Sequence, residues 1–142
     1  AIEQVRSWMA ADPPDPAYVE TLARLYALAG KTDQRIEALE QLADRFPENA
    51  ERQTALGDAL RHAGDPGAAL DCYRNAWRLE PRSDTICDRI VQTLLQLERE
   101  DEALEVARTQ LQHRPGNAEA HYRVGKLLMD EERLVEALEM FR

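Results

Sequence analysis

Aromatic residues, long apolar runs and cysteines are scarce or absent in the 142-residue sequence, and each of these features limits the kinds of protein it can be. Aromatic residues make up only 6% of it while Ala and Leu are abundant, which favours helices, because Ala and Leu lose little side-chain entropy there. No run approaches the roughly 18 consecutive apolar residues of a membrane span, so we expect no direct membrane insertion. The cysteines, Cys72 and Cys87, lie 15 residues apart and match no metal-ligand spacing. We interpret them as two half-buried thiols, and a disulfide stays open if the protein is exported.

The sequence also lacks an excess of basic residues and the motifs that are typical of catalytic sites. The formal net charge is −9 and no segment is basic, whereas a protein that binds nucleic acid needs a positive face. The three histidines, His62, His113 and His121, form no HxxxH or HExxH pattern, and no GxSxG, P-loop or GxGxxG motif occurs. We interpret His121 as a partly buried structural residue. The sequence therefore predicts no enzyme, no metal site, no cofactor and no nucleic-acid partner.

Four prolines stand at a fixed interval of 34 residues, at positions 13, 47, 81 and 115. Proline ends a helix, because it has no N–H to donate and clashes with the preceding turn. Two residues after each proline comes a good helix N-cap, whose side-chain oxygen accepts from a backbone N–H of the first turn. These capping residues are Asp15, Asn49, Ser83 and Asn117. Each proline therefore predicts the end of one helix and the start of the next.

Each 34-residue unit also contains a break near its middle. The breaks are Gly30-Lys31-Thr32, Gly64-Asp65-Pro66, Glu98-Arg99 and Glu132-Arg133. Between the breaks and the prolines, apolar residues recur with a helical period, so each unit is predicted to be two helices joined by a short turn. Neither helix can bury its apolar stripe alone, and stacking of neighbouring pairs solves this. The sequence predicts an all-α fold, a solenoid of stacked antiparallel helix pairs.

These features resemble the tetratricopeptide repeat family, which is built from 34-residue helix–turn–helix units. The best match is residues 50–83, through Leu56-Gly57, Leu60, Ala69, Tyr73, Ala76 and Pro81. The resemblance implies a right-handed superhelix and a protein-binding scaffold. It divides the chain into 1–13 as the second helix of a preceding repeat, repeats 16–49, 50–83 and 84–117, and a repeat 118–142 truncated in its second helix.

The sequence departs from the family pattern in two of these repeats. Arg35 stands where the family prefers Ala, so we expect the first repeat to splay or the Arg35 stem to snorkel. In the third repeat, Val91 replaces a small residue and Ala107 replaces an aromatic one. The chain also begins and ends inside repeats. We therefore expect a fragment of a longer array, whose truncated ends promote self-association.

Members of this family usually bind peptides along a concave groove lined by the first helix of each repeat. The resemblance places in that groove Arg24, Asp58, Arg61, His62, Arg89, Gln92, Tyr122, Arg123 and Lys126. The arginines could pair with acidic groups of a partner or neutralise acids of the groove itself. A second candidate surface is an acidic rim at the inter-helix turns, either a solvated edge or a docking strip for a basic partner. The rim comprises Glu98, Glu100, Asp101, Asp130 and Glu131.

The leading functional prediction is a scaffold that binds a segment of another protein in its concave groove. An alternative is an assembly or regulatory segment of a larger bacterial enzyme or of an envelope or exopolysaccharide secretion machine. An RNA-binding helical repeat is the third reading, which the charge of −9 and the 34-residue spacing disfavour. The sequence does not name the partner. The cytoplasm is favoured as the compartment, and the periplasm stays open.

Overall fold

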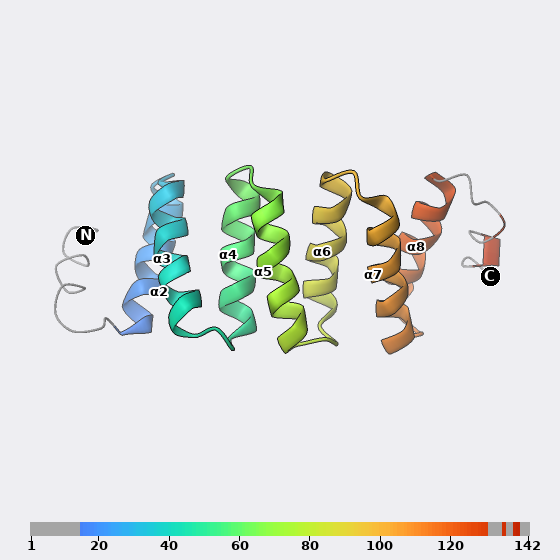
Figure 1. Cartoon of the computed structure of the whole chain (residues 1–142), viewed down its shortest axis with the longest axis horizontal. Helices are drawn as coiled ribbons and strands as arrows, with labels where there is room; N and C mark the ends of the chain where they lie inside the picture. Colours follow the sequence, from blue (N-terminus) through green and yellow to red (C-terminus); the bar gives the residue numbers. More distant parts are fainter. Residues whose placement is uncertain (1–14, 131–134, 136–137, 140–142) are drawn as a thin grey trace. The chain divides into compact units, whose positions relative to one another are not determined.

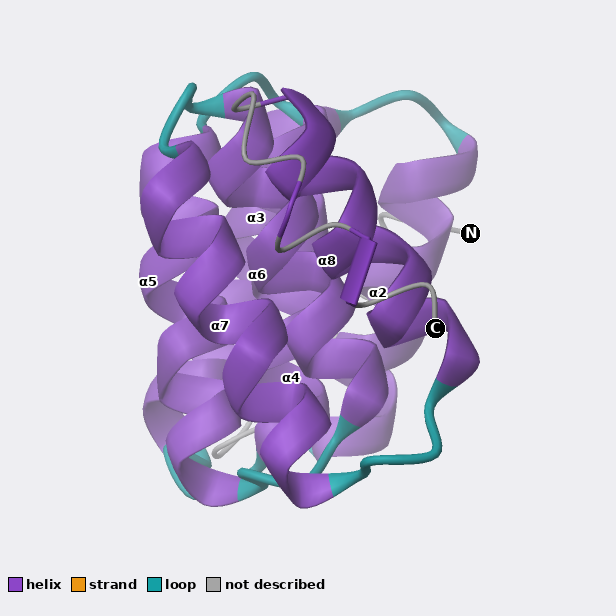
Figure 2. Ribbon diagram, turned by 90° about the vertical axis from the view of Figure 1, so that its right-hand side faces the viewer, coloured by secondary structure: helices purple, strands orange, loops and turns teal. Residues whose placement is uncertain are grey.

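A computed structural model of the chain describes residues 15–130, 135 and 138–139. Over these residues it consists of helices and short connections, and the predicted all-α fold of paired helices is confirmed (Figures 1 and 2). The chain divides into two compact units, Ala1–Leu79 and Glu80–Arg142. Unit 1 contains α2 (Pro16–Leu28), α3 (Thr32–Arg45), α4 (Ala50–His62) and α5 (Pro66–Leu79). Unit 2 contains α6 (Asp84–Gln96), α7 (Glu100–His113) and α8 (Ala118–Asp130). The helix predicted within 1–13 lies outside the described residues.

Helix starts follow the 34-residue interval predicted from the prolines. The side chains of Asp15 and Asn49 accept hydrogen bonds from the backbone N–H groups of Ala17 and Arg52, each at 3.0 Å. Asn117 accepts in the same way from the backbone N–H of Ala120 at 3.1 Å. Ser83 also precedes a helix, but its side chain makes no capping hydrogen bond. The predicted capping hydrogen bond is therefore confirmed at three sites, and at the fourth Ser83 only occupies the position; the helix end predicted at Pro13 lies outside the described residues.

The mid-repeat turns share a backbone conformation that the sequence only partly reveals. Gly30 and Gly64 have positive φ angles of 67° and 89°, as expected where a helix ends in the left-handed region. Glu98, one repeat further along, has a φ of 58°. A side chain at this position is strained, because Cβ approaches the following carbonyl oxygen in left-handed backbone. The third turn therefore forms where it was predicted, without the glycine that suits it.

Helix pairs pack through residues whose sizes complement one another. A Cβ atom built on Gly57 of α4 would lie 2.6 Å from the ring of Tyr73 on α5, so the glycine makes room for a ring that is fully buried. The corresponding residues of α2 and α3 are Ala23 and Leu39, which belong to one hydrophobic cluster. In unit 2 they are Val91 and Ala107, both with no exposed area. The two departures of the third repeat thus compensate each other, since a larger residue on one helix accompanies a smaller one on the next.

Both cysteines are free thiols, Cys87 buried and Cys72 half-buried. Burial, which contributes most, and nearby carboxylates, which disfavour a thiolate, together raise the pKa of each thiol to about 11. These carboxylates are Asp71 and Glu40 for Cys72, and Asp88 and Asp84 for Cys87. In this structure the cysteines act as small core residues, as the sequence predicted.

Candidate functional site

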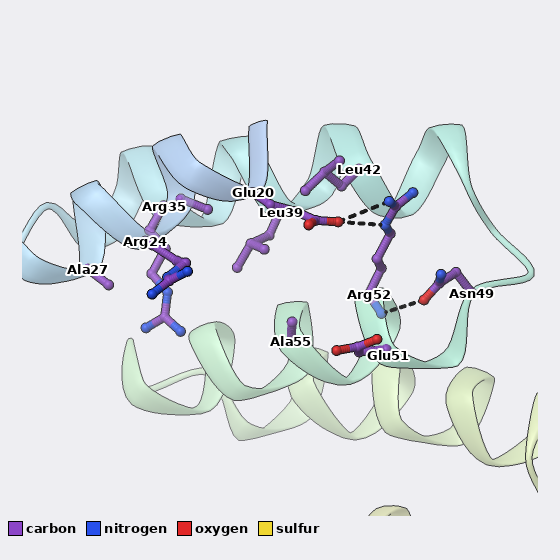
Figure 3. A pocket seen from close by; sticks show the side chains of 11 residues that line it. Glu20, Arg24, Ala27, Arg35, Leu39, Leu42, Asn49, Glu51, Arg52 and Ala55 are labelled. Carbon is purple, nitrogen blue, oxygen red and sulfur yellow. Dashed lines mark hydrogen bonds and ion pairs between the residues drawn. The ribbon is translucent and has the colours of Figure 1, made fainter. Parts of the chain in front are cut away.

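A cavity of about 350 Å³ opens between α2, α3 and α4 of unit 1 (Figure 3). Its charged lining consists of three arginines and two glutamates: Arg24, Arg35, Arg52, Glu20 and Glu51. Its apolar lining consists of Ala23, Ala27, Leu39, Leu42 and Ala55. Helices α2 and α4 are the first helices of consecutive repeats, and Arg24, one of the predicted groove residues, lines the cavity. Its volume falls within the range of small ligand pockets, roughly 300–1,000 Å³.

The charges of this cavity are separated toward its two ends. Figure 3 shows Arg24 and Arg35 together at the end near Ala27. Glu20, Arg52 and Glu51 lie at the opposite end, and Leu39 and Ala55 lie between the two groups (Figure 3). One end is therefore cationic, and an apolar stretch connects it to a mixed-charge end.

The mixed-charge end is held by contacts within unit 1. The Arg52 guanidinium donates to Glu20 Oε1 from both Nε at 3.2 Å and Nη2 at 2.9 Å. The same guanidinium stacks over the ring of Phe46, with its carbon 4.0 Å from the ring centroid. Arg52 therefore joins α4 to α2 and to the end of α3, and its charge is already compensated.

The cationic end has no such compensation. Among the residues that the structure describes, neither the Arg24 nor the Arg35 guanidinium forms a hydrogen bond or an ion pair. Arg24 is exposed and Arg35 is half-buried. Arg35 lines the cavity and is half-buried, and the expectation that its stem snorkels or that the first repeat splays stays a prediction.

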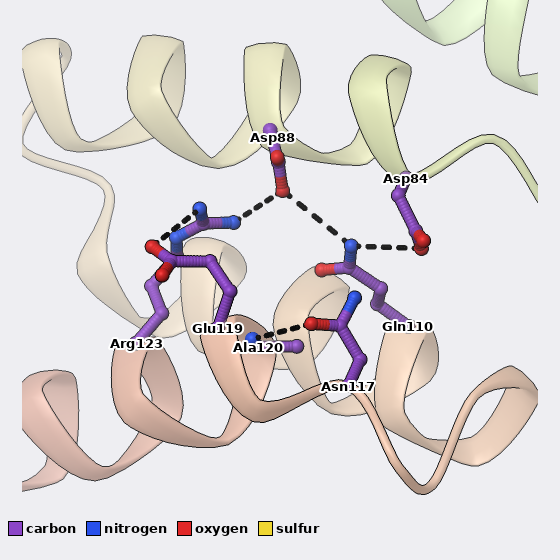
Figure 4. Close-up of polar contacts among 7 residues, drawn as sticks. All are labelled: Asp84, Asp88, Gln110, Asn117, Glu119, Ala120 and Arg123. Carbon is purple, nitrogen blue, oxygen red and sulfur yellow. Dashed lines mark hydrogen bonds and ion pairs between the residues drawn. The ribbon is translucent and has the colours of Figure 1, made fainter.

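Unit 2 carries a polar network that joins its three described helices (Figure 4). The Arg123 guanidinium on α8 donates to Asp88 of α6 and, at 3.5 Å, to Glu119 one turn earlier on α8. The Gln110 amide of α7, which is only 4% exposed, donates to Asp84 Oδ1 at 3.1 Å and to Asp88 Oδ1 at 3.4 Å. Each acid of α6 thus has partners on a neighbouring helix.

The cavity and the network occupy equivalent positions of the repeat. Counting two repeats of 34 residues along the chain relates five lining residues of the cavity to five members of the network. The pairs are Glu20 and Asp88, Leu42 and Gln110, Asn49 and Asn117, Glu51 and Glu119, and Ala55 and Arg123. The same count places Gln92 and Ala103 where unit 1 has Arg24 and Arg35. The same place in the repeat is therefore a cationic cavity in unit 1 and an internally paired network in unit 2.

The groove residues predicted in unit 1 fall into two groups. Arg24 lines the cavity, whereas Asp58, Arg61 and His62 lie further along the chain on α4 and do not line it. Asp58 Oδ1 accepts a hydrogen bond from the Tyr73 hydroxyl at 2.6 Å, and its backbone oxygen lies 2.7 Å from His62 Nδ1. Asp58 therefore helps to hold α4 against α5.

The groove residues predicted in unit 2 lie on the first helices of their repeats. Arg123 is engaged by Asp88 and Glu119, which favours the interpretation that groove arginines neutralise groove acids. The other predicted residues differ in exposure, since Arg89 is half-buried while Gln92, Tyr122 and Lys126 are exposed. A binding role for any of them stays a prediction.

The acidic rim is only partly described. Glu98, Glu100 and Asp101 are all exposed at the turn between α6 and α7. Arg99 reduces the local charge, because its guanidinium donates to both oxygens of Glu102 at 2.6 and 2.8 Å. Asp130 ends α8, and Glu131 lies outside the described residues. The rim as a docking strip stays a prediction.

Sequence reasoning did not select Arg52, Asp84 or Gln110, which make the inter-helix contacts of the two units. The signal that would have found Arg52 is the position of the acids: Glu20 and Asp88 are equivalent in the repeat, and each faces an arginine of the following repeat. His121 behaves as predicted, because it is half-buried and its Nε2 lies 2.7 Å from the backbone oxygen of Pro115.

Among the described residues, no group of three or more His, Cys, Asp or Glu side chains is arranged to hold a metal ion. None of the described helices is long and apolar enough to cross a membrane.

Comparison with known proteins agrees with this geometry. A family model described as "Tetratricopeptide repeat" matches residues 20–83 and 89–142. Over 111 residues the chain is 30% identical to cellulose synthase operon protein C of Pseudomonas fluorescens (strain SBW25). This match covers 78% of the chain but only 9% of the length of that relative.

Solved structures of MamA share the fold. A crystal structure of MamA superposes with a TM-score of 0.81 at 21% identity, covering 99% of this chain and 82% of MamA. The structure titled "MamA RS-1 ArsTM double mutant" gives 0.78 at 14% identity, covering 99% of this chain and 79% of that one. At such low identity these matches speak for the fold alone.

Proposed function

Because the chain belongs to the tetratricopeptide repeat family, whose repeats bind proteins, we propose that it is an interaction scaffold that seats a segment of a partner protein over the cavity between α2 and α4. The observation that carries this proposal is the cavity itself, about 350 Å³ in volume with an apolar lining between two polar ends. Such a surface suits a peptide with alternating apolar and polar side chains.

Site-specific photo-crosslinking tests this location. A photoreactive amino acid at Ala27, which is exposed and lines the cavity, should crosslink to a discrete segment of a partner in cells of the source organism. The same amino acid at Glu37, which is exposed on α3 and does not line the cavity, is the control. Equal crosslinking of that segment from Glu37 would contradict the proposed location, and mass spectrometry would identify the segment in either case.

A second function is favoured by the similarity to cellulose synthase operon protein C. We propose that the chain serves as an assembly or regulatory segment of a larger bacterial machine that makes or exports an envelope polysaccharide. The test is purification of the full-length protein from its own organism. The proposal is supported if a polysaccharide synthase or export component co-purifies with the protein and crosslinks to it from Ala27. It is contradicted if none of the co-purifying proteins is such a component.

The acidic turn between α6 and α7 is the surface proposed for a basic partner. Reversing the charge of Glu100 and Asp101 to Lys should abolish binding of a partner that docks there, since both side chains are exposed. A partner that survives this change but is lost on changing cavity residues would assign binding to the cavity.

A further inference from the structure

We propose that Glu20 is a two-position gate residue of the unit 1 cavity, and that Arg52 holds it in the open position. In the open position Glu20 pairs with Arg52 at the mixed-charge end, as Figure 3 shows. In the closed position its carboxylate turns to Arg24, one helical turn later on α2, and its side chain lies across the apolar lining. This inference deepens the proposed function and rests on it, because the gate controls access to the cavity over which the partner segment is seated.

The first argument is that α2 carries a second cation within reach of Glu20. Glu20 and Arg24 stand four residues apart on α2, so their side chains are neighbours on the helix surface. A glutamate four residues before a basic residue is also the favourable order for an ion pair within a helix. The structure nevertheless pairs Glu20 with Arg52, 32 residues along the chain, and the Arg24 guanidinium forms no ion pair among the described residues. The pairing within α2 is therefore an unused alternative.

The second argument is that unit 2 forms both kinds of ion pair at the equivalent place in the repeat. Arg123 of α8 pairs with Asp88 on α6, which is the repeat equivalent of Glu20, and also with Glu119 four residues earlier on its own helix. A pair between helices and a pair within one helix are thus both compatible with this backbone. In unit 1 one carboxylate has to choose between the two, because its two arginines lie toward opposite ends of the cavity (Figure 3).

The third argument is the fixed position of Arg52. Its guanidinium donates to Glu20 Oε1 from Nε at 3.2 Å and from Nη2 at 2.9 Å, and its carbon lies 4.0 Å from the centroid of the Phe46 ring. Only 18% of the Arg52 side chain is exposed, whereas Arg24 is an exposed residue. A guanidinium that is stacked and partly buried loses less freedom on pairing and is screened less by salt than an exposed one. Stacking on Phe46 therefore favours the open position of Glu20.

NMR of the 142-residue chain, with arginine labelled with nitrogen-15, reports the position of Glu20 without any partner. The readout is the Nε–H signal of Arg24, which contact with a carboxylate shifts. In the otherwise unchanged chain, Glu20→Gln should move this signal only slightly, because Glu20 pairs with Arg52 there. Arg52→Gln should shift the signal, since the carboxylate then turns to Arg24. Adding Glu20→Gln to Arg52→Gln should return the signal to its original place.

Two further variants make this result decisive. Arg52→Lys keeps the charge but lacks the planar fork that stacks on Phe46, so it should shift the Arg24 signal in the same direction by a smaller amount. Arg114→Gln removes an ion pair between helices of unit 2 and is the matched control, which should leave the Arg24 signal unchanged. The gate is overturned if the Arg24 signal keeps its original place in both Arg52 variants, or if the shift persists in the double variant that also lacks the Glu20 carboxylate.

The partner crosslink from Ala27 measures access to the cavity. Arg52→Gln should lower its yield about twofold, as expected from the strength of an ion pair within a helix, and Glu20→Gln added to it should restore the yield. A loss that this second substitution does not restore would show that Arg52 acts through helix packing alone, and would overturn its control of access. Failure of the proposed function is distinguishable: the unchanged chain would then give no crosslink from Ala27, while the Arg24 signal would still report where Glu20 lies.

Discussion

The two units of the chain place opposite chemistry at the same position of the repeat. In unit 1, Arg24 and Arg35 share a cavity, and neither guanidinium forms an ion pair among the described residues. In unit 2, Arg123 reaches Asp88 on another helix, and the amide of Gln110 joins the same acid. The helices that carry these side chains have the same lengths and the same spacing in both units.

The difference shows that side chains at a few positions decide whether the charged groups of a repeat form ion pairs within the protein. An arginine at the Ala55 position reaches the acid of the preceding first helix, as Arg123 shows in unit 2. Arg35 lines the same cavity from the second helix of its repeat, and its guanidinium forms no ion pair among the described residues. Arg52, three residues before Ala55, forms an ion pair with Glu20 at the opposite end of the cavity from Arg24 and Arg35. The two units thus differ in the placement of their charges, while the lengths and spacing of the helices are the same.

Thiol reactivity compares the cores of the two units and carries the largest expected effect. Since burial raises the pKa of Cys72 and Cys87 to about 11, the thiolate that reacts with iodoacetamide at pH 8 should be about 100-fold scarcer than in an unfolded chain. Half-buried Cys72 should react before buried Cys87. Mass spectrometry of the labelled peptides, with and without urea, measures both rates.

The sign of the accompanying pH dependence follows from the same shift. The folded state holds the thiol protons to about pH 11, while unfolded cysteine releases them at lower pH. The contribution of burial to stability is therefore complete at neutral pH and is lost as the pH rises toward 11. Rapid labelling of either cysteine at pH 8 without urea would contradict this account.

Packing between the first and second helix of a repeat is the next comparison. Gly57→Ala in unit 1 should lower the free energy of unfolding by about 2 kcal/mol, because its Cβ would lie 2.6 Å from the Tyr73 ring. Adding Tyr73→Leu recreates the Ala23 and Leu39 combination and should recover part of this loss. Urea unfolding followed by circular dichroism measures both variants. Additive losses would show that the two positions are independent and would refute the size-complementarity explanation.

Opening the unit 2 network tests the role assigned to Arg123. Arg123→Ala should lower the free energy of unfolding by about 1–2 kcal/mol, because it leaves Asp88 partly buried beside Gln110 without its cation. Arg24→Ala in unit 1 is the matched control and should change stability by less than about 0.5 kcal/mol, since Arg24 has no described partner. Urea unfolding at low and high salt measures both variants. Equal decreases in the free energy of unfolding would show that Arg24 and Arg123 contribute equally to stability, and that the units do not differ in their charge pairing.

The helix starts and turns were predictable because each depends on a local signal. Proline and a capping side chain act within a few residues, so Asn49 and Asn117 could be assigned from sequence alone. Ser83 occupies the same position without the hydrogen bond, because its side-chain rotation depends on surroundings that the spacing does not specify. The local sequence pattern thus predicts where a helix begins, but it predicts only in part which groups accept hydrogen bonds from the backbone N–H groups of the first turn.

The charge network was not predictable because it depends on which of several acids an arginine reaches. The spacing indicates which helices are neighbours, and it placed Arg123 near acids of its groove. It does not choose between Asp88 and Glu119, and the structure uses both. Arg52 escaped notice because it pairs from a different position of the repeat than Arg123 does. Long side chains with several rotatable bonds make such partners a matter of three-dimensional geometry.

The turn between the two helices of a repeat gives the smallest predicted effect on the free energy of unfolding, and here the substitution is expected to stabilise the protein. Glu98 of unit 2 has positive φ where unit 1 has Gly30 and Gly64, and its exposed side chain has no partner in the described part of the chain. Glu98→Gly should therefore raise the free energy of unfolding by about 0.5 kcal/mol: relief of left-handed strain, about 1–2 kcal/mol, exceeds the added chain entropy of glycine, about 0.5–1 kcal/mol.

Two further variants tell backbone strain from charge at this turn. Glu98→Gln removes the negative charge beside Glu100 and Asp101 but keeps the Cβ, so it should gain less than Glu98→Gly. Gly64→Ala in unit 1, where φ is 89° and nothing lies within 4 Å of the added Cβ, should instead lower the free energy of unfolding by about 1 kcal/mol. Urea unfolding measures all three. A gain from Glu98→Gln equal to that from Glu98→Gly would assign the strain to charge repulsion, and the two units would then differ at this turn in charge rather than in backbone conformation.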